Sequence, residues 1–170
     1  MEQYFDKIAA NDESITAVDI VGDQKFLALK AAEKSKSGSA FGTNTHIKTL
    51  KMQKLGLDDD FAKLLGESLA KNTTLEKVVV DSNAITGAGI KALFAGLAQN
   101  TTITEFQVRH QSKTMASAEE QGLPDLLKDN KTVLKVGVDV RNPLVRTQLE
   151  RKTNDNREWQ RKQRLMAKQK

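Results

Sequence analysis

The 170-residue chain contains no cysteine, which excludes disulfide bonds and thiolate metal sites. It also has no apolar run near the roughly 20 residues that a membrane-spanning helix needs. Its N-terminus lacks the apolar stretch of a secretory signal. The length suits one domain with a sizeable core. We therefore expect a soluble, cytoplasmic protein with no membrane partner.

Charge is unevenly distributed along the chain. The formal net charge is +5, but residues 151–170 hold eight Lys or Arg and two acids, so this tail carries +6 and residues 1–150 carry about −1. The chain is thus a near-neutral body with a basic tail. The overall basicity does not indicate a nucleic-acid-binding domain, and we expect no nucleic-acid partner.

One spacing, apolar-x-x-apolar-x-apolar, recurs five times. The copies begin at Ile15, Ile47, Leu75, Ile103 and Val133. Each of the three middle copies is introduced by Asn-Thr, at residues 44, 72 and 100. Residues 75–85 follow the pattern L-x-x-L-x-L-x-x-N-x-L that is typical of leucine-rich repeats. The sequence therefore predicts a repeat protein, a class that mostly binds other molecules.

Apolar stripes at helical spacing separate the repeated segments, for example from Phe61 to Leu69 and from Ile90 to Leu97. Alternating strands and helices require parallel pairing and right-handed crossovers. We predict an α/β leucine-rich-repeat solenoid with about five parallel strands, outer helices and helical caps at both ends. Tyr4, Phe5 and Ile8 mark the first cap, and Pro143 suits the start of the last helix.

The predicted boundaries are residues 1–150 for the repeat domain with its N-terminal capping helix, and 143–170 for a basic helix or tail that packs on the last repeat. Two local irregularities are expected. Residues 31–45, rich in Ser, Lys and Gly, are predicted to form a flexible loop. Pro124 is predicted to kink or delay the helix within residues 116–129.

Several short motifs are candidates for ligand or catalytic sites. Asp58, Asp59 and Asp60 precede an apolar helical stripe, so capping of that helix explains them better than a metal site. Gly87 and Gly89 lack the other residues of a phosphate-binding loop, and close helix packing or a positive φ explains them better. His46 and His110 lie in different repeats without clustered carboxylates. We expect no enzymatic activity, no metal and no cofactor.

The chain resembles the C-terminal leucine-rich-repeat domain of the tropomodulins and leiomodins. The similar stretches are residues 8–12, 15–18, 44–48, 69–75, 81–90 and 154–164. The most specific of them reads Ser-Asn-Ala-Ile-Thr-Gly-Ala-Gly-Ile at residues 82–90. The resemblance implies a cytoskeletal, actin-binding module that contributes to capping of filament pointed ends. The family's long N-terminal half, which binds tropomyosin, has no counterpart here, so the resemblance gives no support for tropomyosin binding.

The resemblance also implies where actin would bind: the strand-to-helix loops at residues 53–57, 81–86 and 109–113, and a helix at about 146–164. The residues expected to contact actin are Gln53, Lys54, Ser82, Asn83, Arg109, His110, Gln111, Arg146, Arg157, Trp159, Arg161, Lys162 and Arg164. Considered as a repeat residue alone, Asn83 is predicted to be structural, with its side chain bonded to loop backbone.

Two alternatives remain open from the sequence. The domain could be a generic leucine-rich-repeat scaffold whose partner is not actin. The basic tail could also serve an adaptor that associates with RNA or anionic lipid, since the same charges would satisfy either. Trp159 favours a docked or partner-bound tail because a large aromatic side chain is costly to leave in water.

Overall fold

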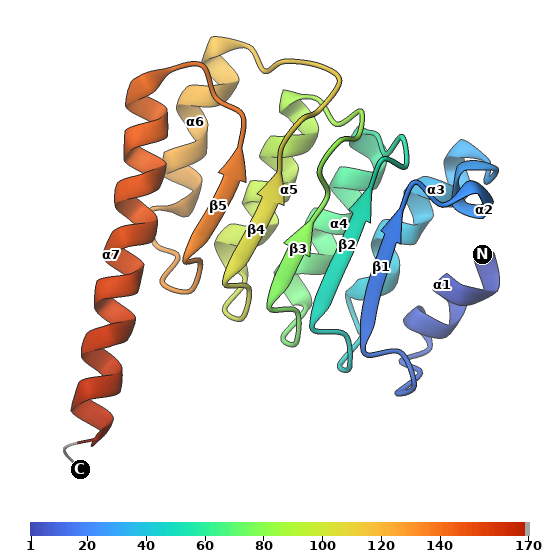
Figure 1. Cartoon of the computed structure of the whole chain (residues 1–170), viewed down its shortest axis with the longest axis horizontal. Helices are drawn as coiled ribbons and strands as arrows, with labels where there is room; N and C mark the ends of the chain where they lie inside the picture. The colour runs from blue at the N-terminus through green and yellow to red at the C-terminus, as the bar shows by residue number, and fades with distance from the viewer. Residues whose placement is uncertain (169–170) are drawn as a thin grey trace.

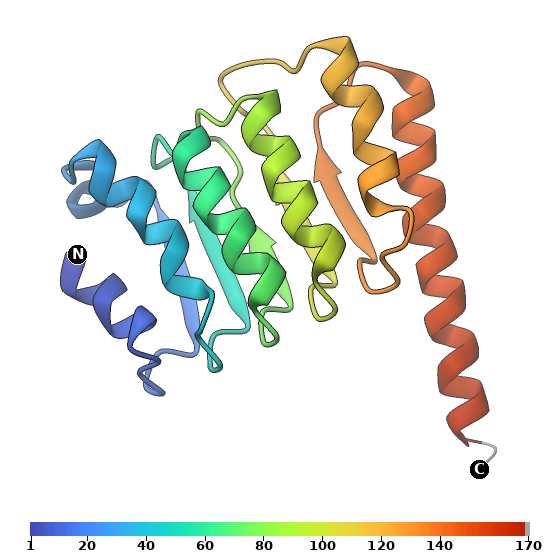
Figure 2. The same ribbon diagram turned by 180° about the vertical axis from the view of Figure 1, so that it is seen from behind.

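The computed structural model describes residues 1–168. Its elements are α1 (Glu2–Ala9), β1 (Ala17–Val21), α2 (Gln24–Leu27), α3 (Ala31–Ser37), the 3₁₀ helix η1 (Gly38–Phe41), β2 (Thr49–Gln53), α4 (Asp59–Lys71), β3 (Lys77–Val79), α5 (Gly87–Gln99), β4 (Glu105–Val108), α6 (Ser117–Leu127), β5 (Lys135–Val138) and α7 (Pro143–Lys168). The strands form one parallel sheet in chain order. Helices α3 to α6 cover one face of this sheet (Figures 1 and 2). The predicted α/β solenoid with five parallel strands is confirmed.

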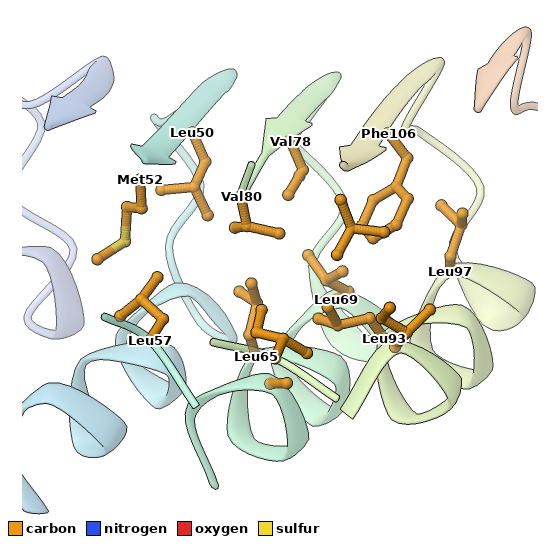
Figure 3. Close-up of a cluster of buried hydrophobic side chains, with 14 of the residues drawn as sticks. Leu50, Met52, Leu57, Leu65, Leu69, Val78, Val80, Leu93, Leu97 and Phe106 are labelled. Carbon is orange, nitrogen blue, oxygen red and sulfur yellow. The ribbon is translucent and has the colours of Figure 1, made fainter. Parts of the chain in front are cut away.

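Equivalent positions of successive repeats lie side by side. Leu50 pairs with Val78, and Val78 pairs with Phe106. These side chains are fully buried and point toward Leu65 and Leu93 of the covering helices (Figure 3). Because one face of each strand is buried, a slip of one residue would turn its apolar side chains to solvent. The apolar triplets of the sequence therefore set the register of the sheet.

A ladder of buried asparagines joins the repeats at Asn44, Asn72, Asn100 and Asn130. The side-chain Nδ2 of Asn72 donates to the Asn44 carbonyl at 2.9 Å, and that of Asn100 donates to the Asn72 carbonyl at 2.8 Å. Asn130 continues the series onto the Asn100 carbonyl at 3.0 Å. The Asn-Thr motif marks the repeats in the sequence, but neither this hydrogen-bonding role nor the fourth member, Asn130, was predicted from it.

Both ends of the stack are covered by helices. Phe5 of α1 is buried, and its ring lies edge-on to Phe26 and Phe41, with centroids 5.7 and 6.3 Å apart. At the other end, α7 buries Val145 and Leu149 against the last repeat. Each cap thus replaces the apolar neighbour that the terminal repeat lacks, as the sequence predicted.

Two local predictions are wrong. Residues 31–41 form α3 and η1 rather than a flexible loop. Close packing explains this, because a Cβ on Gly38 would lie 2.8 Å from the Phe61 carbonyl oxygen, so only glycine permits the approach. The late start proposed for the helix that contains Pro124 is also wrong: α6 begins at Ser117 and continues through Pro124 to Leu127.

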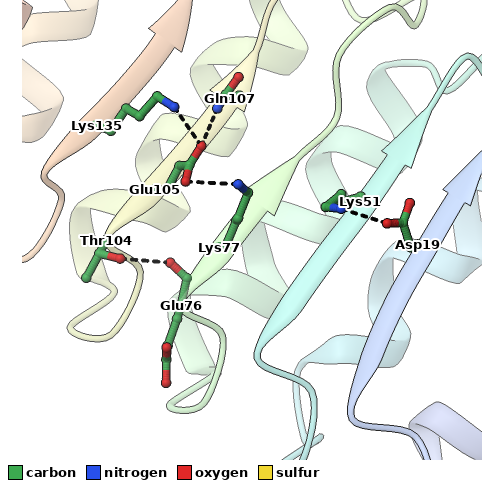
Figure 4. A network of polar contacts seen from close by, with 8 residues as sticks. All are labelled: Asp19, Lys51, Glu76, Lys77, Thr104, Glu105, Gln107 and Lys135. Carbon is green, nitrogen blue, oxygen red and sulfur yellow. Dashed lines mark hydrogen bonds and ion pairs between the residues drawn. The ribbon is translucent and has the colours of Figure 1, made fainter.

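The uncovered face of the sheet carries charges that pair with one another. Glu105 lies 3.0 Å from both Lys77 and Lys135, and Lys51 lies 2.7 Å from Asp19 (Figure 4). Burial by itself would raise the pKa of Glu105, but hydrogen bonds from Lys135, Lys77 and Gln107 outweigh it and lower the pKa. These charges are therefore paired within the domain, and their excess is a single positive charge, so the face offers little net charge to a partner.

Replacing Glu105 by glutamine is expected to lower the free energy of unfolding by about 1 kcal/mol at pH 7. Because the pKa of Glu105 is lowered on folding, its contribution is present above the ordinary glutamate range and is lost as pH falls through the folded-state pKa. Urea unfolding at pH 7 and pH 3 should therefore show a larger difference from wild type at pH 7 than at pH 3. Glu76→Gln, at an exposed ion pair with Lys48, is the matched control and should have a smaller effect. Equal effects at both pH values would contradict the assignment.

Candidate functional site

The predicted strand-to-helix loops lie at one edge of the molecule. Each follows the carboxyl end of a parallel strand, after β2, β3 and β4, so the three loops form a continuous border (Figure 1). Parallel pairing produces this arrangement because the carboxyl ends of all the strands point the same way. The structure therefore brings residues 53–57, 81–86 and 109–113 together as a row.

The three loops share one backbone conformation. Lys54, Ser82 and His110 occupy equivalent positions with φ of 56°, 58° and 56°, and Gly22 has 58° at the same position of the first repeat. A backbone hydrogen bond also recurs: Ser82 donates to the Arg109 carbonyl at 2.9 Å, as Gly22 does to the Gln53 carbonyl. Each turn is thus held to the next, and the side chains at 54 and 110 are exposed on the border.

Glycine substitutions at Lys54, Ser82 and His110 are expected to preserve the fold. The left-handed backbone region costs a non-glycine residue of order 1 kcal/mol, and glycine relieves this strain while adding entropy to the unfolded chain. The two effects oppose, so each variant should change the free energy of unfolding by less than about 1 kcal/mol. Lys54→Val should instead destabilise by about 1–2 kcal/mol, because β-branched residues fit positive φ poorly. Thermal melts of the two Lys54 variants test this, and equal stability would contradict the backbone argument.

The side chain of Asn83 is 4% exposed and fully hydrogen-bonded within the domain, so it offers little surface to a partner. The Nδ2 atom donates to the carbonyls of Met52 and Val80 at 2.9 Å each, and Oδ1 accepts from the backbone N–H of Leu55 at 2.9 Å. Its predicted structural role is confirmed.

Gln111 has a comparable structural role in the next loop. Its Nε2 donates to the carbonyls of Val80 and Arg109 at 3.0 and 3.1 Å, and its Oε1 accepts from the Ile85 N–H at 3.1 Å. The side chain is only partly exposed. Repeat spacing already makes Gln111 the equivalent of Asn83, and the structure shows that the longer glutamine makes comparable hydrogen bonds there.

The structure unites part of the predicted site in an open groove of about 490 Å³. Arg109 and His110 from the β4–α6 loop line it together with Arg146 and Glu150 of α7. Asp139 holds one wall: its Oδ2 accepts from the His110 N–H at 2.6 Å and lies 3.8 Å from the imidazole Nδ1. Loop and helix residues far apart in the sequence are thus neighbours.

The remaining helix residues lie on the free end of α7. The last buried side chain of this helix is Asn156, whose Nδ2 donates to the Val133 carbonyl at 2.9 Å. Beyond it the helix projects past the last repeat (Figure 2). The predicted contact residues on this projecting part are Arg157, Trp159, Arg161, Lys162 and Arg164, all exposed. Gln53 and Lys54 lie in the loop after β2, two repeats away from the groove. The predicted contact residues therefore fall in three places: the loops after β2 and β3, the groove with the β4–α6 loop that lines it, and the free end of α7.

The aspartate cluster at residues 58–60 is a capping feature, as predicted. The Oδ1 of Asp58 accepts from the Phe61 N–H at 3.1 Å. Asp59 accepts from the Thr86 N–H at 2.7 Å and from its hydroxyl at 2.5 Å, which ties the start of α5 to the start of α4. Within residues 1–168 there is no group of three or more His, Cys, Asp or Glu placed to hold a metal ion. No helix in this range is long and apolar enough to cross a membrane.

Gly87 and Gly89 pack closely against neighbouring side chains, and neither has a positive φ. A Cβ on Gly89 would lie 2.6 Å from a methyl carbon of Ile85 and would also collide with Asp59. The close-packing interpretation of these glycines is therefore confirmed.

Comparison with known proteins agrees with this architecture. The TMOD/LMOD leucine-rich domain model matches residues 1–159. Human leiomodin-2 is 32% identical over 165 residues, which cover 97% of this chain and 30% of the relative. Rat leiomodin-1 is 31% identical over 136 residues, or 80% of this chain and 22% of the relative. The chain thus spans less than a third of the length of these relatives.

Two solved structures share the fold. One is described as leiomodin-1 actin-binding site 2, with a TM-score of 0.89 and 28% identity over 98% of this chain and 95% of that one. The other is the tropomodulin C-terminal domain from Caenorhabditis elegans, with a TM-score of 0.85 and 19% identity over 96% of this chain and 97% of that one. At that identity the second likeness supports the fold alone. The family match over residues 1–159 shows that the chain belongs to the TMOD/LMOD leucine-rich domain family.

Proposed function

We propose that this domain binds actin and contributes to capping of filament pointed ends, as a cytoskeletal binding module without enzymatic activity. The observation that carries the proposal is the likeness, over 98% of the chain, to a structure described as leiomodin-1 actin-binding site 2. The contact surface would comprise the strand-to-helix loops and α7. Tropomyosin is not part of the proposal.

The distribution of charge supports the loop edge and α7, rather than the open face of the sheet, as the contact surface for actin. Ion pairs on that face use its charges internally, at Asp19–Lys51 and at Lys77–Glu105–Lys135. The loops instead expose Lys54 and Lys113, and within residues 1–168 neither of these lysines forms a salt bridge. Cations without an internal partner are better placed to meet the acidic surface of actin.

Capping by this domain alone is expected to be weak. The domain corresponds to 30% of human leiomodin-2, so other binding segments of such a longer protein would be missing from an experiment on these 170 residues. Linked sites raise apparent affinity without any new contact within one site, because the second binding event becomes intramolecular. The assay must therefore extend to high protein concentrations.

The direct test is pointed-end elongation from actin seeds that are blocked at their barbed ends. Labelled actin is added with this protein from sub-micromolar to tens of micromolar concentrations, and dose-dependent slowing is expected. The triple variant Lys54→Gly, Ser82→Gly, His110→Gly removes three side chains at positions where glycine suits the backbone. Combined with Arg146→Ala, it should weaken the effect by at least about tenfold, as expected when several contact residues are lost.

The matched control is Thr73→Ala with Thr101→Ala, at exposed positions of the opposite, helix-to-strand loops. This variant should slow elongation as wild type does. If the wild-type protein neither slows elongation nor sediments with filaments at the highest concentration, the proposed function is wrong. If both variants behave like wild type, actin binds through another surface.

A further inference from the structure

The two ends of the solenoid carry complementary surfaces. At the N-terminal end, an open groove of about 250 Å³ lies between α1 and the α3–η1 segment. Phe5, Ala9, Leu29 and Ala40 supply its apolar lining. Its charged lining residues are Glu2, Asp6 and Glu33 against a single cation, Lys36. Gln3, Ser37 and Ser39 complete the lining, so the groove is partly apolar and has an acidic border.

The free end of α7 has the opposite character. Arg157, Arg161, Arg164 and Lys168 follow the spacing i, i+4, i+7, i+11, which places them along one side of a helix. Within the described chain, the only acid paired with any of these four is Glu158, which lies 3.0 Å from Arg161. The same segment exposes large apolar side chains, with Trp159 at 44%, Leu165 at 53% and Met166 at 58%. At helical spacing Leu165 lies beside the row of cations, whereas Trp159 and Met166 lie on the opposite side of the helix.

One chain cannot satisfy both surfaces by itself. The groove lies beside β1 at the first repeat, whereas α7 packs at β5 and projects away from the sheet (Figures 1 and 2). Contact between them requires two molecules. The row of cations, with Leu165 beside it, matches the acidic border of the groove in charge, and this chain carries both parts.

We propose that the free end of α7 docks into the α1–α3 groove of a second copy of this chain, giving head-to-tail self-association. The contact is heterologous, so each complex leaves one groove and one helix end free and can grow by addition of further copies. A helix end of about 12 residues in this groove buries less than the roughly 1,600 Å² of a standard interface. The association is therefore weak, with electrostatic attraction as its main source of specificity.

The association would be measured by sedimentation velocity on the full chain from 10 to several hundred micromolar, at low and at high salt. The expected result at low salt is a rise in average mass with concentration, and high salt should reverse it. A monomer at all concentrations in low salt overturns the proposal.

Variants that reverse the charge of the groove or of the helix end distinguish specific docking from unspecific aggregation. The groove variant Glu2→Lys, Asp6→Lys and the helix variant Arg157→Glu, Arg164→Glu alter exposed side chains, and each alone should associate at least about tenfold more weakly than wild type. An equimolar mixture of the two offers a basic groove to an acidic helix end, and an acidic groove to a basic helix end. Mixing should restore association. If the mixture stays monomeric while both variants have wild-type melting temperatures, the docking mode is wrong.

Because the test uses no actin, its outcome is independent of the proposed function. Lys48→Glu and Lys71→Glu, exposed cations outside both surfaces, form the matched control. This double variant changes net charge as much as the helix variant does and should associate like wild type. If the control and the helix variant weakened self-association equally, net charge alone would explain the effect, and the proposed contact would be overturned.

Discussion

Asn100→Ala is expected to lower the free energy of unfolding by about 3–5 kcal/mol, because the side chain satisfies four backbone groups at the centre of the stack. Its Nδ2 donates to the carbonyls of Leu69 and Asn72, both at 2.8 Å. Its Oδ1 accepts from the N–H groups of Thr102 and Ile103 at 2.8 and 2.7 Å. Alanine supplies no partner for any of them, and the site is 3% exposed, so water cannot readily replace the amide.

Urea unfolding followed by circular dichroism would measure this effect. Thr101→Ala is the matched control: it changes the next residue, whose side chain is exposed, and should cost less than about 0.5 kcal/mol. Asn44→Ala should cost less than Asn100→Ala, because the Asn44 Nδ2 donates to one carbonyl, that of Ile8 at 3.1 Å, whereas the Asn100 Nδ2 donates to two. If Asn100→Ala and Thr101→Ala were equally mild, the ladder would contribute little to stability.

Gly96→Ala is expected to destabilise the domain by about 2–4 kcal/mol even though alanine is the better helix former. Gly96 of α5 faces Gly66 of α4, and a Cβ at position 96 would collide with the Gly66 carbonyl group. A Cβ on Gly66 would in turn lie 2.5 Å from the Ala92 carbonyl oxygen. The obstacles are backbone atoms of packed helices, so the two helices must separate to admit a methyl group.

Gly122→Ala in α6 is the matched control for this prediction. A Cβ at Gly122 meets no atom within 4 Å, so the substitution should stabilise by about 0.5–1 kcal/mol through helix propensity. Thermal and urea unfolding of the two variants should therefore shift in opposite directions. A stabilising Gly96→Ala would mean that α4 and α5 can move apart at little cost.

The sequence by itself determined the repeat architecture. Apolar triplets recur at a fixed interval, starting at Ile47, Leu75 and Ile103. Strands stacked side by side bury these triplets together, and the structure aligns them in register. The caps followed from the same physics, since Phe5 and Leu149 are apolar residues placed where a stack would otherwise end in water. These predictions succeeded because hydrophobic burial depends on spacing along the chain.

Sequence alone did not determine which polar side chains face inward. Asn83 was predicted both as structural and as a contact, and only the structure shows that its side chain is buried and bonded to Met52 and Val80. Residues 31–41 looked like a loop by composition, but packing of Gly38 on α4 makes them helical. Local propensity is a weak guide where a contact with a distant element outweighs it.

The arrangement of the candidate binding surface also depends on the tertiary structure. The sequence pointed to the loops and to α7 separately, but the groove that joins Arg109 and His110 to Arg146 exists only once α7 folds back over β5. The charge pairing of the open sheet face likewise requires Lys77, Glu105 and Lys135 to meet across three strands. Repeats fix the neighbours of each strand through short-range periodicity, whereas surfaces made by different repeats depend on how the whole stack and its last helix come together.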